Sequence, residues 1–191
     1  MKRYASVVMM CMAALPALAE MQSYQADLSH TNVHFAVTHF ERSQIRGRFN
    51  KIEVRELQWD AATGQGKLEV EIDPDSVDTG SRLLDYVLKG EQYFHSKEFS
   101  SIRFSASQFV ASNGQLQAVH GQLTLHGQTL PLVLQAKRFT CGSVKLALIT
   151  RQVCGGDFSA SISRSTFGLG RLVPEVADQV QLDMSIEASP R

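Results

Sequence analysis

Short runs in which apolar and polar residues alternate recur along the chain, and they limit its fold more than any other feature. In Lys67–Ile72 every second residue is apolar and the residues between are charged. The second half of Asp27–His39 shows the same pattern. A period of two is typical of a β-strand with one dry face and one solvated face. We therefore predict strands at both places, with Asp27–His39 as the first strand of the fold.

Further strands are indicated by the same alternation and by turn signals at regular intervals. They are predicted at Ile45–Phe49, Ile102–Phe109, Gly121–Leu125, Leu130–Ala136, Val144–Ile149, Phe158–Ile162 and Val176–Ile186. Ile52, Val54, Leu57 and Trp59 also alternate, with a slip of one residue between the second and the third. Hairpin turns are expected at Asn113-Gly114 and at His126–Gln128. Eight to ten short strands with this spacing predict an all-β sandwich or barrel.

One helix is predicted among these strands, at Ser81–Lys89. Ser81 is a good N-terminal cap and Gly90 stands where a helix commonly ends. Leu84 and Leu88 share one face, which Val87 extends.

The first 19 residues have the pattern of a secretory signal peptide. Lys2 and Arg3 precede the apolar run Val7–Leu15, and Ala17-Leu18-Ala19 is a small-x-small cleavage site. The apolar run is too short to cross a bilayer, which takes about 20 residues. We predict cleavage after Ala19, a mature domain over residues 20–191, and export to the periplasm of a Gram-negative cell.

Charge and motifs exclude several classes of function. The chain has 19 basic and 19 acidic residues, so it has no excess of positive charge that would favour binding to a nucleic acid. No later apolar run predicts stable membrane insertion. The sequence lacks a G-x-S-x-G, an H-E-x-x-H and a P-loop, so we do not predict an enzyme or a cofactor.

Two cysteines, Cys141 and Cys154, remain after the predicted cleavage. An exported protein is in a compartment where disulfides form, and a hairpin around Val144–Ile149 would bring the two together. We predict a disulfide; the alternative is two buried free thiols.

Three histidines lie close together near the first strand: His30, His34 and His39. A spacing of four residues along a strand separates side chains by roughly 13 Å, too far for one ion. We therefore predict no metal site and expect His30 to form a hydrogen bond near the start of the strand.

Several segments, in this order, resemble the YceI-like family of periplasmic polyisoprenoid-binding proteins. They are Asp27-x-Ser29-His30-Thr31-x-Val33-x-Phe35-x-Val37-x-His39, Gly47-x-Phe49, Ser76-Val77-Asp78-Thr79, Gly121-x-Leu123-Thr124-Leu125-x-Gly127-x-Thr129-x-Pro131, Arg164-Ser-x-Phe167-Gly168 and Val176–Ile186. Gly90 and Ser100 depart from the family pattern, which has Ser and Pro there. The resemblance implies an extended, lipocalin-like antiparallel β-barrel of about eight strands with one helix. It also implies that the lumen binds a long-chain isoprenoid, either a polyprenyl phosphate or a quinone tail.

The inward faces of the predicted strands give the candidate lipid-binding residues. These are Val33, Phe35, Val37, Phe49, Leu68, Val70, Ile72, Phe104, Leu123, Leu125, Leu132, Leu134, Phe158 and Ile162. An eight-stranded barrel either packs solid or holds one slender ligand. The alternative function is therefore a non-catalytic exported scaffold with a filled barrel, and a lipid hydrolase is a third hypothesis.

A polar head group at the mouth would need cations or hydrogen-bond donors. The candidates are Arg46, Arg48, Arg82, Arg164 and Arg171. The sequence leaves open whether the lipid is stored or transported, and whether the protein is a monomer or a homodimer.

Overall fold

The computed structural model describes residues 21–60, 63–112 and 115–191. The predicted signal peptide and the Asn113-Gly114 turn lie outside these residues. The strands are β1 Gln22–Ala26, β2 Asn32–His39, β3 Ser43–Phe49, β4 Ile52–Trp59, β5 Gln65–Ile72, β6 Val77–Asp78, β7 Ile102–Ser112, β8 Gln115–Leu125, β9 Gln128–Leu146, β10 Ile149–Ser163 and β11 Val176–Pro190. The helices are α1 Arg82–Lys89 and the 3₁₀ turns η1 Leu28–His30, η2 Pro74–Ser76 and η3 Arg164–Phe167.

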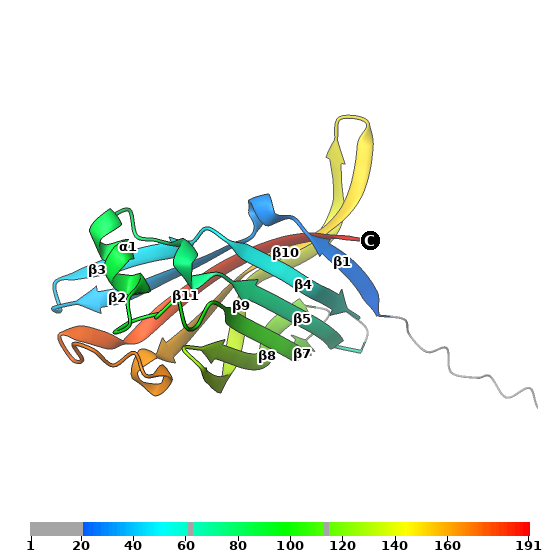
Figure 1. The fold of residues 1–191 in the computed structure, drawn as a ribbon. Coiled ribbons are helices and arrows are strands. Elements are labelled where there is room, and N and C mark those ends of the chain that lie inside the picture. The colour runs from blue at the N-terminus through cyan, green and yellow to red at the C-terminus, as the bar shows by residue number, and fades with distance from the viewer. Residues whose placement is uncertain (1–20, 61–62, 113–114) are drawn as a thin grey trace, which may run out of the picture.

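Eight of the strands form a closed antiparallel ring in the order β1, β4, β5, β7, β8, β9, β10 and β11 (Figure 1). The ring closes where β1 pairs with the last residues of β11, from Tyr24 opposite Pro190 to Ala26 opposite Ala188. This arrangement confirms the predicted lipocalin-like barrel of about eight strands with one helix.

The sheet continues beyond the ring through β2, β3 and β6. β11 is long enough to pair with β1 near its end and with β2 along its first part, where Phe35 lies opposite Leu182. α1 lies at this end of the molecule (Figure 1). The Ser81 hydroxyl caps α1 by accepting a hydrogen bond from the Leu84 amide at 3.4 Å, as predicted.

Two predicted features of these elements were wrong. The first strand is not Asp27–His39, because β1 precedes it and the η1 turn interrupts it. Asp27 begins that turn, and its carboxylate accepts a hydrogen bond from the Ser29 amide at 2.9 Å. Val87 does not extend the inner face of α1, since it is 40% exposed. Gly90 is the C-cap of α1, as predicted, with an ordinary negative φ of −72°.

The β9–β10 hairpin projects from the barrel at the end opposite α1 (Figure 1). Val144–Ile149, predicted as one strand, instead contains the turn of this hairpin, because β9 ends at Leu146 and β10 begins at Ile149. Cys141 and Cys154 lie directly opposite each other in the hairpin and form a disulfide.

Candidate binding cavity

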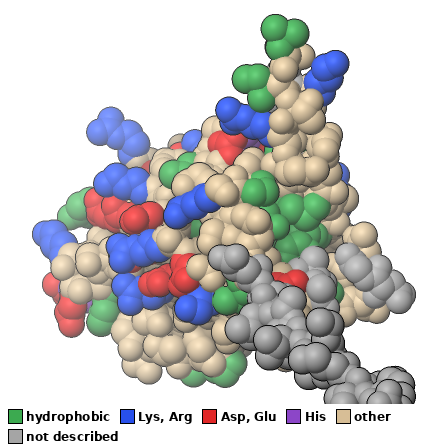
Figure 2. All heavy atoms as spheres, turned by 90° about the vertical axis from the view of Figure 1, so that its right-hand side faces the viewer, with side chains coloured by type: hydrophobic (Ala, Val, Ile, Leu, Met, Phe, Trp, Pro, Cys, Tyr) green, Lys and Arg blue, Asp and Glu red, His purple; other side chains and the backbone are tan. Residues whose placement is uncertain are grey.

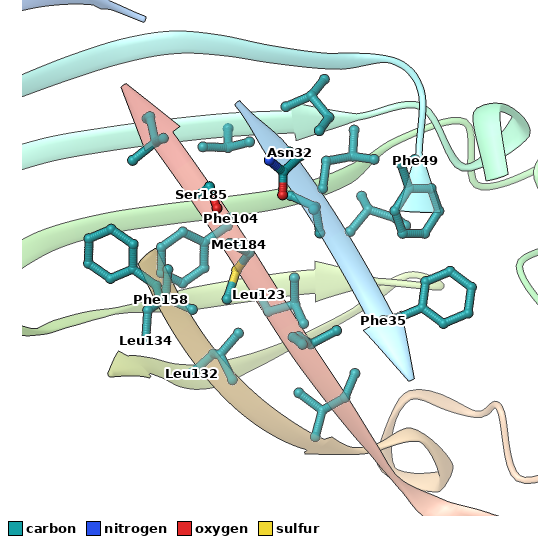
Figure 3. A pocket seen from close by; sticks show the side chains of 18 of the residues that line it. Asn32, Phe35, Phe49, Phe104, Leu123, Leu132, Leu134, Phe158, Met184 and Ser185 are labelled. Atoms are coloured by element: carbon teal, nitrogen blue, oxygen red, sulfur yellow. The ribbon is translucent and has the colours of Figure 1, made fainter. Parts of the chain in front are cut away.

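A cavity of about 460 Å³ occupies the interior of the barrel. Every residue predicted to face the lumen contributes to its wall. Figure 3 shows Phe104, Leu123, Leu132, Leu134 and Phe158 around one part of it, and Phe35 and Phe49 near another. The alternation in sequence therefore identified the inner face correctly.

Close approach of aromatic rings to glycines shapes this wall. Phe35 on β2 lies opposite Gly47 on β3. A Cβ at residue 47 would lie 2.3 Å from Cζ of Phe35, so the ring occupies the space that a side chain would need. Phe104 covers Gly121 in a similar way, with Cζ at 2.6 Å from a Cβ there. A glycine in a strand interior is often explained by such an approach.

Other wall residues were not among the predicted candidates. The helix α1 contributes Leu84 and Leu88, and β11 contributes Val180, Leu182 and Met184. The signal for these was present in the sequence, since both segments have an apolar face. What the sequence does not state is that α1 turns its face toward the barrel interior.

Few polar groups reach the cavity wall. Among the described lining residues there is no Asp, Glu or Lys. Asn32 and Ser185 face each other across β2 and β11 (Figure 3). Trp59 lines the wall with only 7% of its surface exposed, and its indole N–H has no hydrogen-bond partner. Tyr24 also lines the wall, and partial burial raises the pKa of its phenol.

The arginines predicted for the mouth are not gathered around this cavity. Of the five, Arg164 alone is among the described wall residues. Its guanidinium is buried and donates to four backbone carbonyls: Ala177 at 2.9 Å, Val176 at 2.6 Å, Arg171 at 2.8 Å, and Leu169. These donors hold the η3 loop against β11 and are not free for a ligand.

The histidines do not assemble a metal site. No group of three or more His, Cys, Asp or Glu in the described part of the chain could hold an ion. His30 Nδ1 lies 3.0 Å from Asp27 Oδ2, which is the strand-start hydrogen bond expected of it. Hydrogen bonds from Ser29 and His30 lower the pKa of Asp27 to about 2. This pair belongs to the η1 turn and lies outside the cavity.

A match to the model of the YceI-like domain covers residues 24–188. The chain belongs to the YceI-like family. A UPF0312 protein of Shewanella oneidensis is 32% identical over 167 residues, which cover 83% of this chain and 82% of the relative.

Two solved structures share the YceI-like fold with this chain. The crystal structure of Burkholderia cenocepacia BcnA aligns with a TM-score of 0.70 at 22% identity, covering 85% of this chain and 99% of BcnA. A polyisoprenoid binding domain from Saccharophagus degradans, implicated in plant cell wall breakdown, aligns with a TM-score of 0.61 at 15% identity, covering 89% and 99%.

The described helices include none with the length and apolar character needed to cross a membrane.

Proposed function

We propose that this YceI-like protein is exported and holds a long-chain isoprenoid lipid in its barrel, for storage or transport, without catalysing a reaction. The observation that carries the proposal is the cavity of about 460 Å³ with its almost wholly apolar wall. This volume lies within the range of about 300–1,000 Å³ that is typical of ligand sites.

The cavity is too large to be a packing defect. At about 24 cal/mol per Å³, an empty space of this size would cost on the order of 10 kcal/mol. That cost is comparable with the whole stability of a typical domain. A ligand that fills the space removes this free-energy cost. The cavity therefore favours a binding protein over a scaffold with a filled barrel.

The apolar wall selects the class of ligand. A chain without polar groups along its length leaves no buried donor or acceptor unpaired, and each buried CH₂ contributes about 0.8 kcal/mol. A prenyl chain meets this requirement. The polyisoprenoid binding domain from Saccharophagus degradans, which has the same fold, supports the same class.

Organic extraction of the purified protein followed by mass spectrometry tests the proposal. We expect a prenyl lipid in the extract, or uptake of added prenyl lipid by the extracted protein. A clean extract together with no uptake would overturn the proposal.

A variant pair ties the binding to the lumen. Phe35→Asp places a charge on the cavity wall, so we expect at least a tenfold loss of lipid uptake or a loss of folding. His34→Asp is the matched control, because His34 is the exposed neighbour on the outer face of β2. Normal folding and full uptake in Phe35→Asp would show that this face of β2 is not the ligand site.

A further inference from the structure

The outer half of the β9–β10 hairpin forms an arm of two strands that stands clear of the barrel (Figure 1). β8 pairs with β9 only as far as Gln135, and β11 pairs with β10 only from Cys154 onward. Beyond these points β9 and β10 pair with each other, up to Leu146 opposite Ile149. No described residue from 140 to 153 is among those that line the cavity. The arm therefore extends the molecule without enlarging its binding site.

A disulfide holds the arm at its base. Cys141 and Cys154 lie directly opposite each other on the two strands and are bonded. A two-stranded ribbon on its own is only marginally stable in water. The cross-link keeps the strands together where no neighbouring strand does so, and the tip is thereby presented in a defined position.

The tip of the arm exposes apolar side chains to solvent (Figure 2). Leu148, in the turn, is 99% exposed, Ile149 is 57% exposed and Val144 is 42% exposed. Residues that pair across two strands share a face, as do residues two positions apart on one strand. By this register Val144 and Ile149 lie on one face of the arm, with Leu148 at its apex.

Two basic residues flank these side chains. Arg151 lies opposite Val144 and so is on the apolar face, whereas Lys145 lies opposite Thr150 on the other face. Neither forms an ion pair with a residue that the structure describes. The tip is therefore apolar and also carries a free positive charge on each face.

This positive charge is local. The whole chain has 19 basic and 19 acidic residues, but residues 99 to 156 contain five basic residues and no acidic one. Nearer the barrel, Lys137 and Arg138 are neutralised by ion pairs with Asp183 and Asp157. An anionic partner would thus be attracted by the tip and not by the net charge of the protein.

Charge and size together select the class of partner. A symmetric contact between two tips would bring like charges together, which disfavours a second copy of this chain. The end of a two-stranded ribbon also offers far less surface than the roughly 800 Å² per partner of a stable protein interface. Apolar side chains beside cations are instead typical of segments that dock on anionic lipid surfaces.

We propose that this tip docks end-on to an anionic phospholipid bilayer. Leu148 and Ile149 enter the boundary between head groups and acyl chains, while Lys145 and Arg151 stay beside the phosphates. The two cations lie one and two positions behind the last strand pair, which is roughly 3–7 Å along the arm. This setback agrees with the depth of about 5–10 Å to which apolar side chains of interfacial segments are buried.

Docking would also orient the barrel. Cys154 and Gly155, at the base of the arm, are part of the cavity wall, so this end of the barrel would lie next to the bilayer. The docking itself needs no lipid in the lumen.

Sedimentation with vesicles tests the proposal. We expect binding to vesicles of 30% phosphatidylglycerol in phosphatidylcholine, and at least tenfold weaker binding to pure phosphatidylcholine. Leu148→Asp should weaken binding to the anionic vesicles at least tenfold. Lys145→Ser and Arg151→Ser should each weaken it about fivefold, as expected for a basic residue close to an anionic surface.

Matched controls come from elsewhere on the surface. Leu83 on α1 is 75% exposed and lies at the opposite end of the molecule, and Lys97 is an exposed lysine outside the listed ion pairs. Leu83→Asp and Lys97→Ser should change vesicle binding by less than twofold. Unchanged binding by Leu148→Asp, or an equal loss in Leu83→Asp, would overturn the proposal.

Leu148→Trp reports on insertion of the apex. It keeps a large apolar side chain there, so it should bind at least as well as the natural protein. Its added fluorescence should shift to shorter wavelength with anionic vesicles, measured against the parent protein, whose one tryptophan is the buried Trp59. No shift in bound protein, or a dimer in light scattering that Leu148→Asp dissociates, would overturn the docking. Lipid extraction tests the proposed function separately, so the two can fail independently.

Discussion

The contact between Phe35 and Gly47 gives the sharpest test of how the cavity wall is built. A Cβ at residue 47 would lie 2.3, 2.7 and 3.1 Å from Cζ, Cε1 and Cε2 of Phe35, with no backbone atom among these nearest contacts. Gly47→Ala must therefore displace the ring, and overpacking of this kind costs about 1–3 kcal/mol. Gly47 has no positive φ, so the substitution adds no backbone strain.

Removing the ring should reverse the sign of this effect. Leucine lacks Cζ and both Cε atoms, so Phe35→Leu removes all three clashing atoms. In that background Gly47→Ala should be neutral or stabilising by about 0.5 kcal/mol, because alanine loses less backbone entropy than glycine on folding. The coupling free energy of the double-mutant cycle should thus be about 2 kcal/mol.

Urea unfolding of the four proteins, followed by circular dichroism, measures this cycle. Gly121→Ala with Phe104→Leu is the matched control. A Cβ at residue 121 would lie 2.6 Å from Cζ of Phe104 but also 2.5 Å from the carbonyl oxygen of Ser105, so removal of the ring should not rescue it. If Gly47→Ala still destabilised the fold by about 1–3 kcal/mol in the Phe35→Leu background, the Phe35 ring would not be the cause of the clash.

Three further predictions concern the polar contacts and the disulfide of the fold. Arg164→Met removes four hydrogen bonds to backbone carbonyls and should destabilise the fold by about 4 kcal/mol in urea unfolding; a loss below about 1 kcal/mol would contradict that role. The pKa of Asp27 is lowered to about 2 and the pKa of His30 is raised, so the pair should stabilise the η1 turn most between about pH 4 and 6.5. The stabilisation should decrease as pH falls toward 2, and also as pH rises through the folded pKa of His30. NMR titration of the His30 ring, with Asp27→Asn as control, checks both pKa directions. Replacing Cys141 and Cys154 by serine should cost up to about 3 kcal/mol by the chain-entropy model, and an unchanged urea midpoint would show that the disulfide does not constrain the unfolded chain.

Alternation predicted the barrel wall well because burial on one face of a strand imposes a period of two. It even indicated a local irregularity. The slip of one residue in the apolar pattern between Val54 and Leu57 corresponds to a shift of register between β4 and β5 at Val54 and Glu56. A bulge moves the following side chains to the other face, and this is what turns Trp59 toward the cavity.

Other elements left no such signal. β1 has the polar sequence Gln-Ser-Tyr-Gln-Ala, and its place depends on pairing with the end of β11, which is distant in sequence. The hairpin turn at Ala147 has a positive φ of 53°, although alanine is not a residue that favours such turns. The sequence also does not show that the Arg164 guanidinium is buried among backbone carbonyls.

Whether the barrel is hollow or filled could not be decided from the alternation, because both have the same inward residues. The two cases differ in whether the large inward side chains lie along the wall or fill the centre of the barrel. A phenylalanine that lies over a glycine of the next strand, as Phe35 does over Gly47 and Phe104 over Gly121, occupies space at the wall that a side chain would otherwise take. Such a ring leaves the centre of the barrel open. Since the glycine and its ring are separated in sequence and meet only through strand register, the hollow interior is a property of the pairing and not of any one segment.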